Sequence, residues 1–117
     1  MGRKYKLYYD EEYDRLFIAG KTNEDVMAGS LRVINVILDF NTNGSVVNAE
    51  MLHASEYLES LGFNSKILKK AKGGALSIKQ LRNGYEIVFI IKSANKLTYI
   101  PYNVHMPVPK QISLTSA

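Results

Sequence analysis

Residues 39–50, DFNTNGSVVNAE, contain the chemistry-bearing pattern with the most specific spacing in the chain. They match D-x-[DN]-x-[DN]-G-x5-E, the loop that surrounds Ca²⁺ with oxygen ligands between two helices. The specified positions are Asp39, Asn41, Asn43, Gly44 and Glu50. The flanking residues are rich in β-branched types and predict strands, and at ~3.3 Å per residue the last ligand would then lie about 20 Å from the turn. The sequence therefore predicts a tight Asn-Gly turn, with neither a metal nor another cofactor.

A second group of carboxylates lies within five positions near the N-terminus. It consists of Asp10, Glu11, Glu12 and Asp14. Hard cations bind several carboxylate oxygens, so a metal site is one interpretation. The other is a hairpin turn in which Asp10 accepts hydrogen bonds from nearby backbone amides and the glutamates are solvated. We expect the turn. The two histidines of the chain, His53 and His105, have no partner at metal-ligand spacing.

The residues offer little for catalysis. The chain has no cysteine, which excludes thiol catalysis, disulfides and Cys-based zinc sites. His53 and His105 are the plausible imidazole bases, but each stands near an expected strand end with no nucleophile motif around it. We therefore expect a protein that is not an enzyme. Carboxylates that converge in space are the alternative by which it would be one.

The net charge of +4 is divided unevenly along the chain. Residues 1–64 contain 6 Lys and Arg against 10 Asp and Glu, which gives −4, and residues 65–117 contain 9 against 1, which gives +8. The basic residues of most interest are Lys66, Lys69, Lys70, Lys72, Lys79 and Arg82. They either contact nucleic-acid phosphates, with Tyr85, Tyr99 and Tyr102 stacking on bases, or form a solvated face or a protein-partner surface.

The length and hydropathy of the chain bound its organisation. With 117 residues it has the length of one domain. We expect residues 1–107 to form that domain and residues 108–117 to be a mobile tail. No apolar run approaches the ~20 residues of a membrane-spanning helix, and the N-terminus lacks the apolar segment of a secretory signal. We expect a cytoplasmic protein without a membrane partner.

Alternating apolar residues and turn signals predict a mostly antiparallel sheet of hairpins. Strands are expected over residues 4–10, 14–20, 31–40, 45–54, 75–81, 85–92 and 97–106. Residues 21–30 lack periodicity and predict a loop. Ser55 and Ser65 are expected as N-caps of two short helices, the second ending at Gly73–Gly74. The fold class is therefore α+β in the order ββ-ββ-α-βββ, with one or two short helices packed on the sheet.

Turn positions suggest the register of two hairpins. A turn over residues 41–44 places Asp39 opposite Val46, and it gives the hairpin one apolar face and one mixed face. A turn at Asn83–Gly84, the strongest hairpin signal in the chain, places Leu76 opposite Ile91.

The mixed face of the first of these hairpins contains an unexplained charge. Glu50 is expected there beside Asn35 and Asn48, together with the apolar Ile37 and Val46. No structural role for the Glu50 carboxylate inside a strand is evident from the sequence. The three polar residues are therefore candidates for a polar network, either at a subunit interface or around a ligand.

Two segments resemble a family of short bacterial and archaeal domains of unknown function. Its first signature, Y-D-x-x-x-D-x-L-Y-I, is matched by Tyr9, Asp10, Asp14, Leu16 and Ile18, with Phe17 in place of the second tyrosine. Its second, D-x-x-x-x-G-x-V-V-x-x-E-x-L-x-A-S, is matched by Asp39, Gly44, Val46, Val47, Glu50, Leu52, Ala54 and Ser55. The resemblance covers the first half of the chain. It implies no activity or cofactor, and it implies an antitoxin-like role only through members that look like partners of small toxin-like proteins.

These observations lead to three hypotheses. The leading one is a small non-enzymatic binding module that self-associates as a dimer, because apolar residues on the mixed face would otherwise be solvated. The second is a nucleic-acid-associated or antitoxin-like protein that uses the basic C-terminal half. The third is an enzyme with convergent carboxylates.

Overall fold

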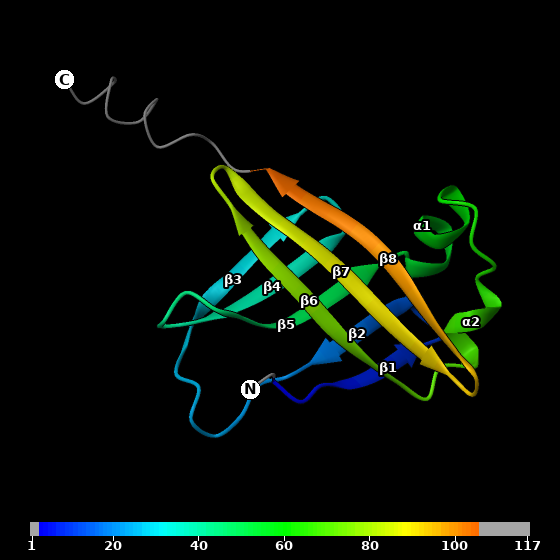
Figure 1. Cartoon of the computed structure of the whole chain (residues 1–117), viewed down its shortest axis with the longest axis horizontal. Helices are drawn as coiled ribbons and strands as arrows, with labels where there is room; N and C mark the ends of the chain where they lie inside the picture. Colours follow the sequence, from blue (N-terminus) through cyan, green and yellow to red (C-terminus); the bar gives the residue numbers. More distant parts are fainter. Residues whose placement is uncertain (1–2, 106–117) are drawn as a thin grey trace.

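The computed structural model describes residues 3–105 (Figure 1). Its strands are β1 (Lys6–Asp10), β2 (Arg15–Ala19), β3 (Met27–Val33), β4 (Val36–Asn41), β5 (Val46–Leu52), β6 (Gly73–Leu81), β7 (Gly84–Ser93) and β8 (Lys96–His105). Its helices are α1 (Ala54–Ser60) and α2 (Lys66–Lys69). The tail expected over residues 108–117 lies outside the described residues.

The strands form two antiparallel sheets. Five strands in the order β1-β2-β5-β4-β3 form one sheet, and β6-β7-β8 form the other. This confirms the predicted α+β class of antiparallel hairpins with two short helices. The sequence predicts a single sheet, whereas the two sheets here pack face to face (Figure 1). Helices of 7 and 4 residues are too short to cover five strands, so the second sheet covers the apolar face of the first.

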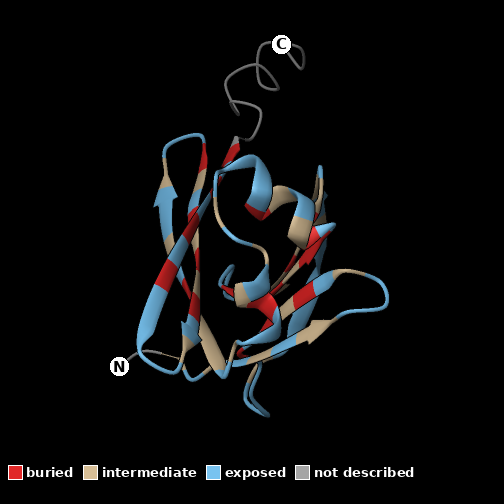
Figure 2. Cartoon of the chain, turned by 90° about the vertical axis from the view of Figure 1, so that its right-hand side faces the viewer, coloured by how far each residue is buried: buried red, intermediate tan, exposed pale blue. Residues whose placement is uncertain are grey.

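The core lies between the two sheets. The five-stranded sheet contributes Leu16, Ile18, Leu38 and Met51, and the three-stranded sheet contributes Phe89, Ile91 and Ile100. Figure 2 shows both helices between the sheets at one end of the molecule, where Leu58 and Leu68 are buried. Neither helix within residues 3–105 has the length and hydropathy needed to cross a membrane.

The two sheets come closest where β1 passes β6. A Cβ atom added to Gly74 would lie 2.6 Å from Leu7 Cδ1 and 2.7 Å from the carbonyl oxygen of Ile90. Only glycine fits at this position, because real Cβ atoms do not approach other heavy atoms so closely. The predicted end of the second helix at Gly73–Gly74 is therefore wrong, since both glycines belong to β6.

The predicted strand over residues 31–40 is also wrong as a single element. The chain turns at Ile34–Asn35, so that β3 pairs with β4, and β3 begins within the predicted loop. Ile34 has φ 52° and its side chain is 82% exposed, a combination that a β-branched residue rarely adopts. Tertiary contacts hold this turn, because the backbone N–H of Leu52 donates to Asn35 O (2.7 Å) and Asn35 Nδ2 donates to Leu52 O (3.0 Å).

Both predicted registers are shifted by two residues. Glu50 pairs with Ile37, and the β4–β5 pairing contains an irregularity where Phe40 meets Val46. In the other hairpin Leu76 pairs with Phe89, because the turn is formed by Arg82 and Asn83. Since successive side chains alternate between faces, a shift of two leaves most paired residues on their predicted faces. Val46 is the exception, because it pairs with Phe40 at the irregularity and is buried in the core, so its predicted place on the mixed face is wrong.

Candidate functional site

The outer face of the five-stranded sheet is exposed, and no helix or strand within residues 3–105 lies over it (Figure 2). The central row of this face crosses all five strands. It runs from β1 to β3 through Tyr8, Phe17, Glu50, Ile37 and Arg32. Tyr8 is 63% exposed and its ring centroid lies 6.0 Å from that of Phe17. Tyr8, Phe17 and Ile37 give this row an apolar surface, which the carboxylate of Glu50 interrupts and the exposed Arg32 ends at β3.

Glu50 is the residue of this row that has a buried polar atom without a hydrogen bond. Its side chain is 19% exposed, and Oε2 is buried without a hydrogen-bond partner. Arg15 Nη1 lies 3.4 Å from that oxygen, so the two form an ion pair without hydrogen-bond geometry. A buried polar atom left without a hydrogen bond costs about 1–3 kcal/mol. Because this oxygen is buried, Arg15 is the group that compensates its charge, and covering the face would strengthen that ion pair.

The other two members of the predicted polar set have structural contacts instead. Asn48 Oδ1 accepts from the backbone N–H groups of Gly20 (3.1 Å) and Lys21 (3.2 Å), while its Nδ2 donates to Asp39 (3.1 Å). Asn35 holds the β3–β4 turn, and its Oδ1 accepts from the Tyr102 hydroxyl (2.9 Å). The structure places Asn35, Asn48 and Glu50 in three separate sets of contacts.

Asp14 joins the first hairpin to α1. Its carboxylate accepts hydrogen bonds from the Tyr9 hydroxyl (2.5 Å), the Ser55 hydroxyl (2.6 Å) and the Ser55 backbone N–H (2.9 Å). The prediction that Ser55 is the N-cap of α1 is therefore wrong, because His53 occupies that position. Ser55 instead bonds to a residue 41 positions earlier in the chain. The family signature residues Tyr9, Asp14 and Ser55 therefore share a structural role.

The chemistry of this cluster argues against a nucleophile at Ser55. Burial opposes ionisation of Asp14, but hydrogen bonds from Ser55 and Tyr9 outweigh it and hold the pKa of Asp14 below its ordinary value. Burial, and then the hydrogen bond to Asp14, raises the pKa of Tyr9. A carboxylate with a lowered pKa is a poor general base, because proton transfer is most effective when the pKa is near the working pH.

Asp10 and the calcium-like pattern both form turns. Asp10 accepts from the backbone N–H groups of Glu12 (3.0 Å) and Tyr13 (3.3 Å), as the turn interpretation predicts. In the calcium-like pattern, Asn41 Oδ1 accepts from the N–H groups of Asn43 (3.0 Å) and Ser45 (2.9 Å). Strands flank this loop, as predicted, and Glu50 lies well inside β5. No group of three or more potential metal-ligating side chains is found among the described residues.

Of the two histidines, His53 lies near Asp14 and helps to lower the pKa of that carboxylate. His53 Nδ1 is 3.5 Å from Glu56 Oε2, and both side chains are largely exposed. His105 is the last residue of β8.

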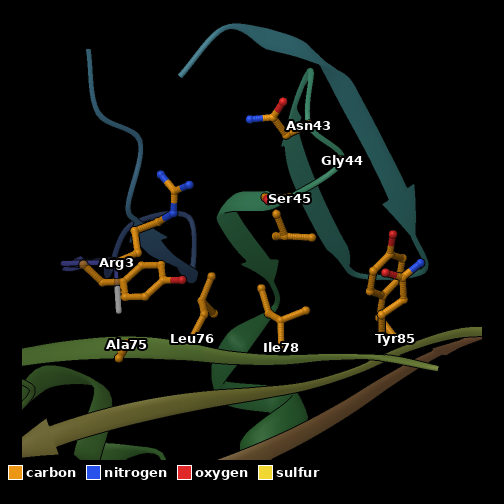
Figure 3. Close-up of a pocket in the computed structure, with 11 residues that line it drawn as sticks. Arg3, Asn43, Gly44, Ser45, Ala75, Leu76, Ile78 and Tyr85 are labelled. Atoms are coloured by element: carbon orange, nitrogen blue, oxygen red, sulfur yellow. The ribbon is translucent and has the colours of Figure 1, made fainter. Parts of the chain in front are cut away.

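A cleft of about 570 Å³ opens between the β4–β5 hairpin and β6 (Figure 3). Leu76 and Ile78 point into it from β6, and Tyr85 lies at one side. The charged side chain that lines it, Arg3, already donates to Asp25 and to the carbonyl of Gly20 (2.9 Å). This cleft offers an apolar floor without a free charged group among the residues that the structure describes.

The six basic residues singled out in the sequence lie at opposite ends of the three-stranded sheet. Lys66 and Lys69 are on α2, and Lys70 and Lys72 follow it, near the β7–β8 turn. Lys79 lies towards the far end of β6, and Arg82 is in the β6–β7 turn (Figure 1).

Two lysines that the sequence did not single out complete the end that holds α2. They are Lys92 and Lys96, which reach this end because β7 and β8 return there. Of the three tyrosines proposed for stacking, Tyr102 is buried and Tyr85 packs on Phe40, whereas Tyr99 is 54% exposed. The β6–β7–β8 hairpins were predicted, so extending their pairing to residues 92 and 96 would have revealed these lysines.

Comparison with known proteins confirms the resemblance of the first half. Residues 6–55 match the model of a family described as "Protein of unknown function (DUF2283)". No curated protein and no solved structure matches the chain. The matched span contains the whole five-stranded sheet and the Asp14–Ser55 contact, whereas the three-stranded sheet lies outside it.

Proposed function

We propose that this protein is a non-enzymatic binding module that self-associates through the outer face of its five-stranded sheet. The observation that carries this proposal is the central row, in which Tyr8, Phe17 and Ile37 surround a half-buried Glu50. Association would remove this apolar surface from water, at about 25 cal/mol per Å².

The charges of this face favour a second copy of the chain as the occupant. Three cations and three carboxylates lie on it: Lys6, Arg15, Arg32, Asp10, Asp39 and Glu50. The face is therefore neutral but mixed in sign. A two-fold axis brings the same patch of both copies together, so a mixed neutral face can be self-complementary where a face of one sign would repel itself.

Glu50 explains why the association would be specific. Its Oε2 has an ion-pair neighbour, Arg15, but no hydrogen bond. A second copy that covers the face would exclude water from this ion pair, and only a partner that leaves Arg15 and Glu50 paired can cover it without leaving an uncompensated charge. An antitoxin-like role remains a prediction from the family resemblance.

The experiment is analytical ultracentrifugation of the full chain over a wide concentration range. We expect the wild type to dimerise and the variant Ile37→Lys to be monomeric, because a lysine in the central row would be buried in the interface. Ile90→Lys is the matched control, since Ile90 is also a partly buried isoleucine on an outer face, that of the three-stranded sheet. We expect it to dimerise like the wild type.

Two results would contradict the proposal. A wild type that stays monomeric at the highest concentration would exclude self-association. Equal loss of the dimer in Ile37→Lys and Ile90→Lys would place the interface elsewhere. Circular dichroism of each variant would show that the fold is retained.

A further inference from the structure

We infer that the end of the molecule that holds α2 and the β7–β8 turn binds single-stranded nucleic acid. The residues that carry this inference are Lys70, Lys72, Lys92 and Lys96, which we call the basic end. Three of them line an open cleft of about 580 Å³ between the segment after α2 and the β7–β8 turn. The fourth is held beside it, because the backbone N–H of Lys72 donates to Lys92 O (2.7 Å).

The positive charge of the basic end is not neutralised within the chain. The neighbouring Lys69 has its Nζ 3.1 Å from Glu11 Oε1, so its charge is compensated. Among the described residues no ion pair involves any of the four lysines of the basic end. Like charges brought together in a small volume raise the local potential and attract a polyanion.

At the opposite end of the three-stranded sheet, positive charge has a negative neighbour. Lys79 pairs across the strands with Glu86, and both side chains are on the outer face. That lysine has a carboxylate as its cross-strand neighbour, which a lysine of the basic end does not have. The surplus of charge is therefore local to the basic end.

An exposed aromatic ring favours a single strand over a duplex. Lys92 pairs with Leu97, and two residues further along β8, on the same outer face, lies Tyr99. Leu97 is 49% exposed and Tyr99 is 54% exposed. Phosphates bound at the basic end would leave a base free to stack on Tyr99, which requires an unpaired base. An exposed aromatic ring beside a group of lysines is the usual platform for single strands.

The test is fluorescence anisotropy of a labelled oligothymidylate and of a duplex of equal length with the full chain. If about four phosphates are neutralised, the slope of log K against log salt for the single strand should be about −3, so binding weakens about 50-fold between roughly 50 and 200 mM salt. The duplex should bind more weakly, because it offers no base to Tyr99.

Two double variants distinguish binding at the basic end from non-specific attraction by the net charge of the protein. Lys70→Glu with Lys96→Glu should weaken binding at least tenfold and reduce the slope by about half, because two of the four phosphate contacts are lost. Lys79→Glu with Arg82→Glu changes the net charge by the same amount at the opposite end and should bind like the wild type. Tyr99→Ala should lose about fivefold or more, and Tyr99→Phe should not.

Three outcomes would overturn the inference. The first is no binding at low salt. The second is equal weakening by both charge-reversal pairs, which would mean that only the net charge of the molecule matters. The third is equal affinity for the duplex, or no effect of Tyr99→Ala, which would remove the single strand as the ligand. None of these results depends on whether the protein dimerises.

Discussion

Each of the two sheets has an exposed outer face, and the two faces differ in the residues that they carry. The five-stranded sheet carries a neutral mixture of charges around an apolar row, and its turns are fastened by Asp14, Asn35 and Asn48. The three-stranded sheet has apolar residues at its outer centre and its unpaired lysines at one end. We propose a copy of the chain as the partner of the first surface and a polyanion as the partner of the second.

The two sheets also differ in their relation to the matched family. The match covers the sheet that is rich in internal polar contacts. Several residues that carry the resemblance hold turns or contacts between elements, so the resemblance reflects how that sheet is built. The three-stranded sheet, outside the match, carries the basic end. The proposed dimer and the proposed nucleic-acid site therefore lie on different sheets and can be tested independently.

The largest effect is expected at the contact that joins the two sheets. Gly74→Ala should lower the free energy of unfolding by about 1–3 kcal/mol, because the new Cβ meets the rigid backbone oxygen of Ile90 and overpacking is costly. Gly73→Ala is the matched control, since nothing lies within 4 Å of its Cβ. Chemical denaturation measures both. Equal stability of the two variants would show that Leu7 and the backbone at Ile90 can shift enough to accommodate the new Cβ.

A smaller effect is expected inside the five-stranded sheet, and it should depend on pH. Asp14→Asn should lower the free energy of unfolding by about 1–2 kcal/mol at neutral pH, because hydrogen bonds to a charged acceptor are lost. The folded state lowers the pKa of Asp14, so its contribution is fully present above the unfolded pKa of about 4 and is lost as the pH falls through the folded value.

The measurement is denaturation of the wild type and Asp14→Asn between about pH 7 and pH 3. The gap in stability between them should narrow below about pH 4. A gap that stays constant over this range would mean that the charge of Asp14 does not contribute.

The smallest effect is expected at the hydroxyl that links the sheets. The Tyr102 hydroxyl lies 2.9 Å from both Val33 O and Asn35 Oδ1, and its single proton is shared between these two acceptors. Tyr102→Phe should therefore cost about 1 kcal/mol, the net value of a typical hydrogen bond. Thermal unfolding measures this loss. Tyr99→Phe, which removes the hydroxyl of an exposed ring on the same strand, should leave the free energy of unfolding unchanged. Equal melting temperatures for the two variants would show that this link adds no stability.

Local features of the fold could be predicted because they depend on near neighbours in the sequence. Alternation of apolar residues predicted the faces of β4 and β5 despite a register error of two residues, except at Val46, which the irregularity turns into the core. The Asn-Gly turn and the backbone contacts of Asp10 follow from side chains that bond within four residues. The turn at Ile34–Asn35 was missed, because an isoleucine with positive φ contradicts every local preference.

The sequence by itself determined the antiparallel hairpins, the two short helices and the charge difference between the halves. Only the tertiary structure decided that the strands divide into two sheets, that Asp14 bonds to Ser55, and that Lys92 and Lys96 join Lys70 and Lys72 while Lys79 and Arg82 lie at the other end. The physical reason is that periodicity and turn preference act over a few residues. Contacts between distant segments depend on which apolar faces must cover each other, and that is settled only when the whole chain is packed.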